Sequence, residues 1–251
     1  MAKIAIFDSG LGSISIIKPI QKKLKSEIIY FADQKSYPYG TKSSKELGKI
    51  IKSTIKKLEE RFEPDLIVVA SNTPSLLLNP ERQSKILGVY PPLKEATTMT
   101  STKSIAILAT KTVIKSRKLQ NYINHQVPMR IKVTKINATP LVDLVESGKF
   151  ISEKEFCKKK IRENLDLIQK RGIDTVTLSS THLPFLLPLL KETFPNVTFL
   201  DPADSVANKV ASLLVNRRSS VSQLKIFASG NTKTFQKKLQ KLGIKNKVFQ
   251  L

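Results

Sequence analysis

Small polar residues gather at a few points of this sequence, most of them directly after a short apolar run. The residues that share this placement are Asp8, Ser9, Ser71, Asn72, Thr73, Ser180, Thr181 and His182. Tyr39 and Gly40 lie in a further segment of tyrosine, proline and glycine. Carboxylates, hydroxyls, amides and imidazoles hold polar ligands and move protons. These residues are therefore the candidates for binding and proton-transfer chemistry.

Short β-branched runs alternate with amphipathic stretches along the chain. The strand-like runs are Ile4–Phe7, Ile28–Phe31, Leu66–Ala70, Ile86–Val89, Ile105–Leu108, Ile131–Thr134, Val176–Leu178, Val197–Leu200, Lys225–Phe227 and Lys247–Phe249. Helical spacing is seen in the apolar stripe of Cys157, Ile161, Leu165 and Ile168. Such alternation predicts an α/β fold with parallel sheets, because parallel strands need a crossover connection. Ligands of these sheets bind beyond the carboxyl ends of the strands, where the candidate residues lie.

A faint internal repeat relates the two halves of the chain. Ile4–Gly10 resembles Ile105–Lys111, and Ser71–Thr73 resembles Ser180–His182, in both cases about 100 residues apart. The repeat predicts two similar α/β domains related by a pseudo-twofold axis, with strand ends that face one cleft. A generic strand-to-helix junction would give the same short patterns, and this alternative stays open.

The charge balance is strongly basic, with 43 Lys and Arg against 20 Asp and Glu and a formal net charge of +23. The lysine clusters are spread over several expected helices: Lys22, Lys23, Lys25, Lys52, Lys56, Lys57, Lys158, Lys159, Lys160, Lys237, Lys238 and Lys241. No RRM, KH or zinc-finger pattern accompanies them, and no stacking aromatics interleave these runs. The pattern favours solvated helix faces over a nucleic-acid partner. A field of this sign also favours acidic ligands.

Length and composition exclude several other classes. The chain has 251 residues, 40% of them hydrophobic, which is typical of a folded globular protein. One cysteine rules out an internal disulfide framework, and together with two histidines it argues against a zinc site. No apolar run is long enough to cross a bilayer, and the first residues enter a strand pattern at once. The sequence therefore predicts a cytoplasmic protein with no membrane partner.

Nucleotide-binding and hydrolase motifs are also missing from the sequence. Gly10 and Gly12 are not followed by the third glycine of a dinucleotide fingerprint, since Ser15 stands at that position. Neither a P-loop nor a Gly-x-Ser-x-Gly elbow occurs. The sequence gives no sign of a nucleotide cofactor.

Taken together, the polar junctions resemble the glutamate racemases of the cofactor-independent aspartate/glutamate racemase family. The segments that carry the resemblance, in order, are Phe7–Gly12, Pro38–Ser43, Ser71–Thr73, Pro140 through Glu146–Gly148, Thr181–Pro184 and Asp201–Ala203. They span nearly the whole chain. Each segment is weak evidence alone, but their order and spacing make the family assignment specific.

The resemblance implies a two-domain enzyme that binds a small acidic amino acid between its domains and needs no cofactor and no metal. In this family the chain returns to its first domain, so we expect residues 1–95 and 208–251 to form one domain and residues 96–207 the other. The resemblance also suggests a link to peptidoglycan precursors. The sequence leaves the assembly state open, a homodimer included.

Within the family, two cysteines on opposite faces of Cα deprotonate and reprotonate the substrate. A thiol suits both tasks, because its pKa is near neutral and readily shifted. At these two positions this chain carries Ser71 and Ser180. Asp8 is the candidate to assist Ser71, and His182, two residues beyond Ser180, is the candidate to assist on the other face. Substrate binding is implied for Asp8, Ser9, Tyr39, Gly40, Asn72, Thr73, Thr181 and His182.

Because serines stand at the two cysteine positions, the sequence alone does not decide which reaction the chain catalyses. A hydroxyl is a much weaker acid than a thiol and becomes a base or nucleophile only with help from a neighbour. The alternatives are a glutamate racemase with doubtful turnover, a binding protein that has lost the chemistry, and a different isomerase or decarboxylase reaction on the same fold. Two further roles also stay open: Asp8 can cap a helix, and Glu146 can be a site acid or a plain surface residue.

Overall fold

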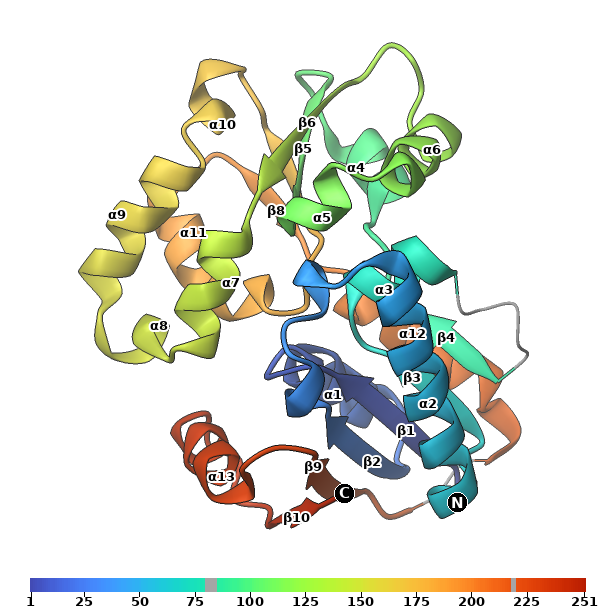
Figure 1. Cartoon of the computed structure of the whole chain (residues 1–251). Coiled ribbons are helices and arrows are strands. Elements are labelled where there is room, and N and C mark those ends of the chain that lie inside the picture. Colours follow the sequence, from blue (N-terminus) through green and yellow to red (C-terminus); the bar gives the residue numbers. More distant parts are fainter. Residues whose placement is uncertain (80–84, 218–219) are drawn as a thin grey trace. The chain divides into compact units, whose positions relative to one another are not determined.

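Two parallel β-sheets, each with its own helices, form the chain in the computed structural model, which describes residues 1–79, 85–217 and 220–251 (Figure 1). The chain divides into two compact units. The first contains Met1–Val89 and Ala203–Leu251, and the second contains Tyr90–Pro202. Among the described residues, no helix is both long and apolar enough to span a bilayer.

The sheet of the first unit has the strand order β10-β9-β2-β1-β3-β4, and every pairing is parallel. Its strands are β1 (Lys3–Asp8), β2 (Glu27–Ala32), β3 (Leu66–Val69), β4 (Ile86–Gly88), β9 (Gln223–Ala228) and β10 (Val248–Gln250). The central strands are rich in Ile and Val and are buried along nearly their whole length. This is the pattern of parallel strands that are covered on both faces.

Helices of the first unit bury apolar stripes against this sheet. They are α1 (Ser13–Lys23), α2 (Ser44–Phe62), α3 (Asn72–Leu78), α12 (Ala203–Leu213) and α13 (Thr232–Lys241). Ser43 caps α2 by accepting a hydrogen bond from the backbone N–H of Glu46. Leu47, Ile51 and Leu58 of α2 pack on the sheet. Full burial of such side chains stabilises the fold by roughly 1.5–3 kcal/mol each.

The second unit repeats this plan with four strands in the order β6-β5-β7-β8, again all parallel. Its strands are β5 (Ser104–Ala109), β6 (Lys132–Asn137), β7 (Thr175–Leu178) and β8 (Thr198–Leu200). Its helices are α4 (Leu93–Met99), α5 (Lys111–Ile114), α6 (Arg117–Gln126), α7 (Thr139–Glu146), α8 (Lys149–Ser152), α9 (Lys154–Asn164), α10 (Leu167–Lys170) and α11 (Leu187–Thr193). The edge strand β6 exposes lysines, which discourages pairing with another chain.

The predicted fold class is confirmed, and each predicted strand-like run overlaps an observed strand. One helical prediction needs correction. Cys157, Ile161, Leu165 and Ile168 are all buried as expected, but they do not share one helix, since α9 ends at Asn164. Leu165 leaves helical geometry, and a tight turn in which the N–H of Ile168 donates to its carbonyl brings the chain back to the core.

Asp174, just before β7, ties the start of this strand to the segment that precedes β5. Its carboxylate accepts hydrogen bonds from the Thr100 hydroxyl at 2.6 Å, from the N–H and hydroxyl of Ser101 at 2.7 and 2.8 Å, and from the Thr102 N–H at 2.8 Å. Partial burial raises the pKa of Asp174, but the hydrogen bonds outweigh it and hold the pKa far below its usual range. The charged form therefore stabilises the fold.

We expect Asp174→Asn to lower the free energy of unfolding by about 1–3 kcal/mol at neutral pH, because bonds to a charged acceptor are lost. A depressed folded-state pKa contributes stability above the unfolded pKa of about 4, and this contribution fades as pH falls toward the folded value. Urea unfolding at about pH 7 and about pH 3 should therefore show a smaller difference in acid. Asp166→Asn, which affects an exposed pair with Lys170, is the control. Equal losses at both pH values would contradict this account of Asp174.

Candidate active site

Three polar residues of the first unit lie side by side at the carboxyl edge of its sheet. Asp8 ends β1, Asp33 follows β2, and Ser71 follows β3. The backbone N–H of Asp33 donates to the carbonyl of Asp8 at 2.8 Å, and that of Ala70 donates to the carbonyl of Phe7 at 2.9 Å. Parallel register therefore brings together residues that are distant in the sequence, at the edge where such sheets bind ligands.

Asp8 is almost fully buried at the end of β1. Its Oδ1 accepts the backbone N–H of Ser9 at 2.6 Å and lies 3.5 Å from the Ser9 hydroxyl. The following helix begins at Ser13, and its N-cap residue is Gly12. Asp8 therefore lies four residues before the N-cap position of this helix.

Asp33 organises a second group at the same edge. It accepts the Tyr39 hydroxyl at Oδ2 and the Ser229 hydroxyl at Oδ1, both at 3.1 Å. Burial raises the pKa of Tyr39 well above its ordinary value, and the nearby charges of Asp33 and Asp8 raise it further. Tyr39 therefore stays a neutral donor. Ser229 was not among the candidates, although it follows the predicted strand Lys225–Phe227 and the same rule would have found it.

Gly40 follows Tyr39 in a short 3-10 helix, Tyr39–Thr41. This segment begins soon after β2 and Asp33, so it belongs to the same edge of the sheet. The Tyr39 side chain is therefore near Asp8 and Asp33, and Gly40 follows it in the chain.

The junction after β3 holds Ser71, Asn72 and Thr73 in a fixed arrangement. Ser71 has an extended backbone, and its side chain does not cap the following helix. The Ser75 hydroxyl donates to the carbonyl of Ser71 at 2.8 Å and accepts the N–H of Val89 at 2.9 Å. Asn72 and Thr73 open the helix, and both are buried. The chain thus fixes the backbone of Ser71 without using its hydroxyl as a cap.

Asn72 combines a satisfied donor with an unused acceptor. Its Nδ2 donates to the carbonyl of Val89 at 3.1 Å, which fixes the orientation of the amide. Its Oδ1 is buried and has no hydrogen-bond partner among the described residues. A buried acceptor without a donor is costly, and such atoms in a folded protein call for an explanation.

The second unit places its candidate residues at the carboxyl end of β7. The N–H of Ser179 donates to the carbonyl of Leu108 in β5 at 2.9 Å, so this junction lies beside the neighbouring strand end. Ser180, Thr181 and His182 follow directly, and all three are buried. The Ser180 carbonyl accepts the N–H of the residue that begins the next 3-10 turn, which shapes a tight junction.

The buried His182 forms a pair with the partly buried Glu146 at the end of α7. The His182 Nε2 lies 2.8 Å from Glu146 Oε1, and the two side chains are only 7% and 12% exposed. Asp143 lies one turn earlier on α7. Burial raises the pKa of Asp143, the charge of His182 opposes this effect, and the charge of Glu146 adds to it. Glu146 is therefore an interior partner of His182, and the plain-surface alternative for it is wrong.

The structure brings the candidate residues together in two groups. The first unit contains Asp8, Ser9, Tyr39, Gly40, Ser71, Asn72 and Thr73, and the second contains Ser180, Thr181 and His182. Ser71 and Ser180 belong to different units, so their pairing across one substrate stays a prediction. In the described part of the chain, no three His, Cys, Asp or Glu side chains are grouped so that they could hold a metal.

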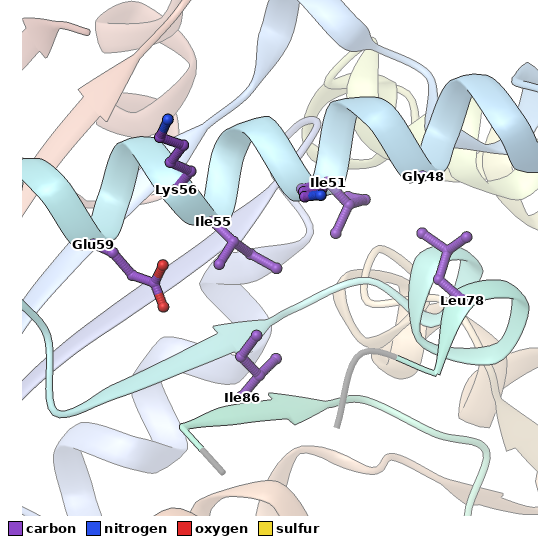
Figure 2. A pocket seen from close by; sticks show the side chains of 8 residues that line it. Gly48, Ile51, Ile55, Lys56, Glu59, Leu78 and Ile86 are labelled. Carbon is purple, nitrogen blue, oxygen red and sulfur yellow. The ribbon is translucent and has the colours of Figure 1, made fainter. Parts of the chain in front are cut away.

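A pocket of about 430 Å³ lies between α2 and β4, on the first unit (Figure 2). Ile51, Ile55 and Ile86 give it an apolar lining, to which Lys56 and Glu59 add charged side chains. None of the candidate residues lines it.

Comparison with known proteins identifies the family. No family model matches the chain. Glutamate racemase of Actinobacillus pleuropneumoniae serotype 3 is 32% identical over 84% of this chain and 81% of its own length. That of Lactobacillus acidophilus is 31% identical over 93% and 90%. The crystal structure of Escherichia coli glutamate racemase, in complex with L-glutamate and the activator UDP-MurNAc-ala, superposes with a TM-score of 0.84 at 25% identity and covers 100% of this chain and 98% of that one.

These similarities span the whole of both units and define the class as an isomerase fold of two parallel α/β domains. The chain belongs to the glutamate racemase family. The resemblance expected from the sequence motifs is thereby confirmed.

Proposed function

We propose that the chain binds glutamate, or a closely similar acidic amino acid, and acts at its Cα without a metal or cofactor, with slow turnover. Membership of the glutamate racemase family supports the substrate class. The observation that carries the proposal within this chain is the buried, unpartnered Oδ1 of Asn72 next to Ser71. An ammonium group has three donors, and one of them can satisfy this acceptor.

The remaining polar groups suit a ligand with two carboxylates. Hydroxyls of Ser9, Thr73 and Thr181 can donate hydrogen bonds to carboxylate oxygens, as can backbone N–H groups at Tyr39 and Gly40. The net charge of +23 adds a field that attracts an acidic ligand. Asp8 and Asp33 are buried carboxylates, and their negative charges favour the one positive charge of an amino acid.

Racemisation needs an acid and a base on opposite faces of Cα, because the proton leaves from one side and returns on the other. We assign these positions to Ser71 in the first unit and Ser180 in the second. Asp8 is buried on the strand next to Ser71, and His182 follows Ser180 by two residues, so each serine has a titratable neighbour. These neighbours are the groups that would help a hydroxyl accept or donate the proton.

The same two serines favour a second candidate function, that of a binding protein with no turnover. Each pKa unit between a hydroxyl and a thiol costs about 1.4 kcal/mol of proton-transfer driving force. Substrate binding does not depend on this acidity, because the polar groups that hold the ligand are separate residues. The chain can therefore bind its ligand without catalysing a reaction.

Calorimetry tests the binding half of the proposal. We expect glutamate to bind the unmodified chain at millimolar concentration or better. Asn72→Ala and Thr181→Ala should each weaken binding by roughly tenfold or more, because a hydrogen bond to a charged ligand is lost. Asn124→Ala, on exposed α6, removes the same group elsewhere and should leave binding unchanged. If neither glutamate nor aspartate binds, the assigned substrate class is incorrect.

Proton exchange tests the reaction half. The chain is incubated with D- or L-glutamate in deuterated buffer, and loss of the Cα proton is followed by nuclear magnetic resonance. Slow exchange of both enantiomers supports a weak racemase, and binding without exchange supports the binding protein. Exchange of only one enantiomer would indicate a different reaction, in which proton transfer occurs on only one face of Cα.

A further inference from the structure

The C-terminal part of the first unit has a one-sided charge. Every charged side chain after Asp204 is a lysine or an arginine. Some lysines elsewhere in the chain are paired with an acid four residues away, as in Lys42–Glu46, Lys56–Glu60 and Lys170–Asp166. The helix α13 contains no acid that could pair in this way.

This helix presents three lysines on one stripe. Phe235 and Leu239 are buried, and the Phe235 ring lies 6.1 Å from that of Tyr30 in β2. Lys233, Lys237 and Lys241 are exposed and follow each other at intervals of one turn. Residues four apart on a helix have Cβ atoms about 5–6 Å apart. The three ammonium groups therefore form a row along the solvent face.

Two further lysines are fixed beside this row. Gln236 of α13 donates from Nε2 to the carbonyl of Asn246 at 2.8 Å and accepts the N–H of Val248 at Oε1 at 2.9 Å. These bonds hold the segment before β10 against the helix, and both elements lie together at the C-terminal end of the chain (Figure 1). Lys245 and Lys247 are exposed on this segment. We call the five lysines 233, 237, 241, 245 and 247 the C-terminal basic face.

The elements packed against α13 do not neutralise this face. They are β9, β10 and, through the ring contact of Phe235, β2. Glu27 is the acid on these strands, and it is already paired with Lys225 at 2.7 Å. Within the face, Lys247 Nζ lies 5.4 Å from the ring centroid of the exposed Phe249. The surface therefore combines uncompensated cations with one exposed aromatic ring.

We propose that the C-terminal basic face binds the phosphate backbone of nucleic acid without reading its sequence. A row of exposed cations along one helix matches a regularly charged polyanion, and such contacts supply most of non-specific binding to nucleic acid. A membrane surface fits less well, because the apolar residues of α13 point into the core and leave no apolar face to enter a bilayer. The sequence shows the lysines near 237–241, but it does not show that Lys245 and Lys247 lie beside them, because that placement depends on the bonds of Gln236.

The test is fluorescence anisotropy of a labelled short DNA duplex with the full chain. We expect binding at low salt whose logarithmic affinity falls with the logarithm of salt concentration, with a slope of about −0.9 for each phosphate contacted. The variant K233E/K237E/K241E should bind about tenfold or more weakly, with a shallower salt slope. K233Q/K237Q/K241Q should show a smaller loss of affinity. This variant removes the positive charges without adding negative ones, so it controls for effects of like charges on helix stability.

The matched control is K45E/K49E/K52E, which makes the same change of net charge on exposed positions of α2. It should bind more tightly than K233E/K237E/K241E, while circular dichroism shows that all variants are folded. Equal loss in both triple variants would overturn the assignment to this face, because net charge alone would explain it. Absence of binding by the unmodified chain, or binding to vesicles of anionic lipid but not to DNA, would overturn the proposal itself.

Discussion

Replacement of both Ser71 and Ser180 by cysteine is expected to raise the rate of glutamate racemisation by orders of magnitude. An unperturbed thiol has a pKa of about 8.5, so a modest local field leaves a useful fraction as thiolate at neutral pH. A serine hydroxyl is a far weaker acid. The structure supports the substitution, because the Ser71 side chain does not cap α3 and cysteine is close to serine in size.

Single substitutions separate the two faces. Ser71→Cys or Ser180→Cys alone should gain less, since one face would still lack a competent acid or base, and each is expected to exchange the Cα proton of one enantiomer only. The measurement is optical rotation or chiral chromatography for racemisation, with deuterium exchange for each enantiomer. Ser53→Cys, exposed on α2, adds a thiol away from the candidate residues and should change nothing. Fast racemisation by the unmodified chain would contradict the expectation that Ser71 and Ser180 make the reaction slow. Asp8 and His182 would then be the proton-transfer groups to test.

The sequence predicted the strands well because each one is a short β-branched run between helical patterns. In parallel sheets the carboxyl ends meet at one edge, so residues such as Asp8 and Ser71 could be grouped from the sequence alone. The same rule applied to Lys225–Phe227 would have added Ser229. The family resemblance added order and spacing, which the short motifs lack on their own.

Other features depend on contacts that no local pattern encodes. Glu146 and His182 are distant in the sequence, and their contact follows from the packing of α7 against the 3-10 helix Leu183–Leu186. The break between α9 and α10 leaves every apolar position buried, so periodicity alone could not reveal it. The C-terminal basic face arises because Gln236 holds two lysines beside a helix that carries three more.

The second large effect is expected at the Glu146–His182 pair. Both side chains are nearly buried, and the pair is joined at 2.8 Å. Removal of one partner from a buried pair typically costs about 3–5 kcal/mol, because the other partner loses its compensation. Glu146→Ala should therefore lower the free energy of unfolding by up to this amount. Glu146→Gln keeps an oxygen that can accept a hydrogen bond from Nε2, so its cost should be clearly smaller.

A positioning role for Glu146 requires more than lost stability. In the S71C/S180C background, Glu146→Ala should lower kcat more than it raises KM, because His182 loses its orientation beside residue 180 while the groups that bind substrate remain. Glu146→Gln should restore much of kcat and shift the pH profile, since it keeps the hydrogen bond and removes the charge. Glu155→Ala removes an exposed carboxylate whose partner Lys158 is also paired with Glu192, so it should change unfolding by less than about 1 kcal/mol and leave kcat unchanged. A variant Glu146→Ala that is destabilised but keeps full kcat and an unchanged pH profile would show that the pair supports the fold and takes no part in proton transfer.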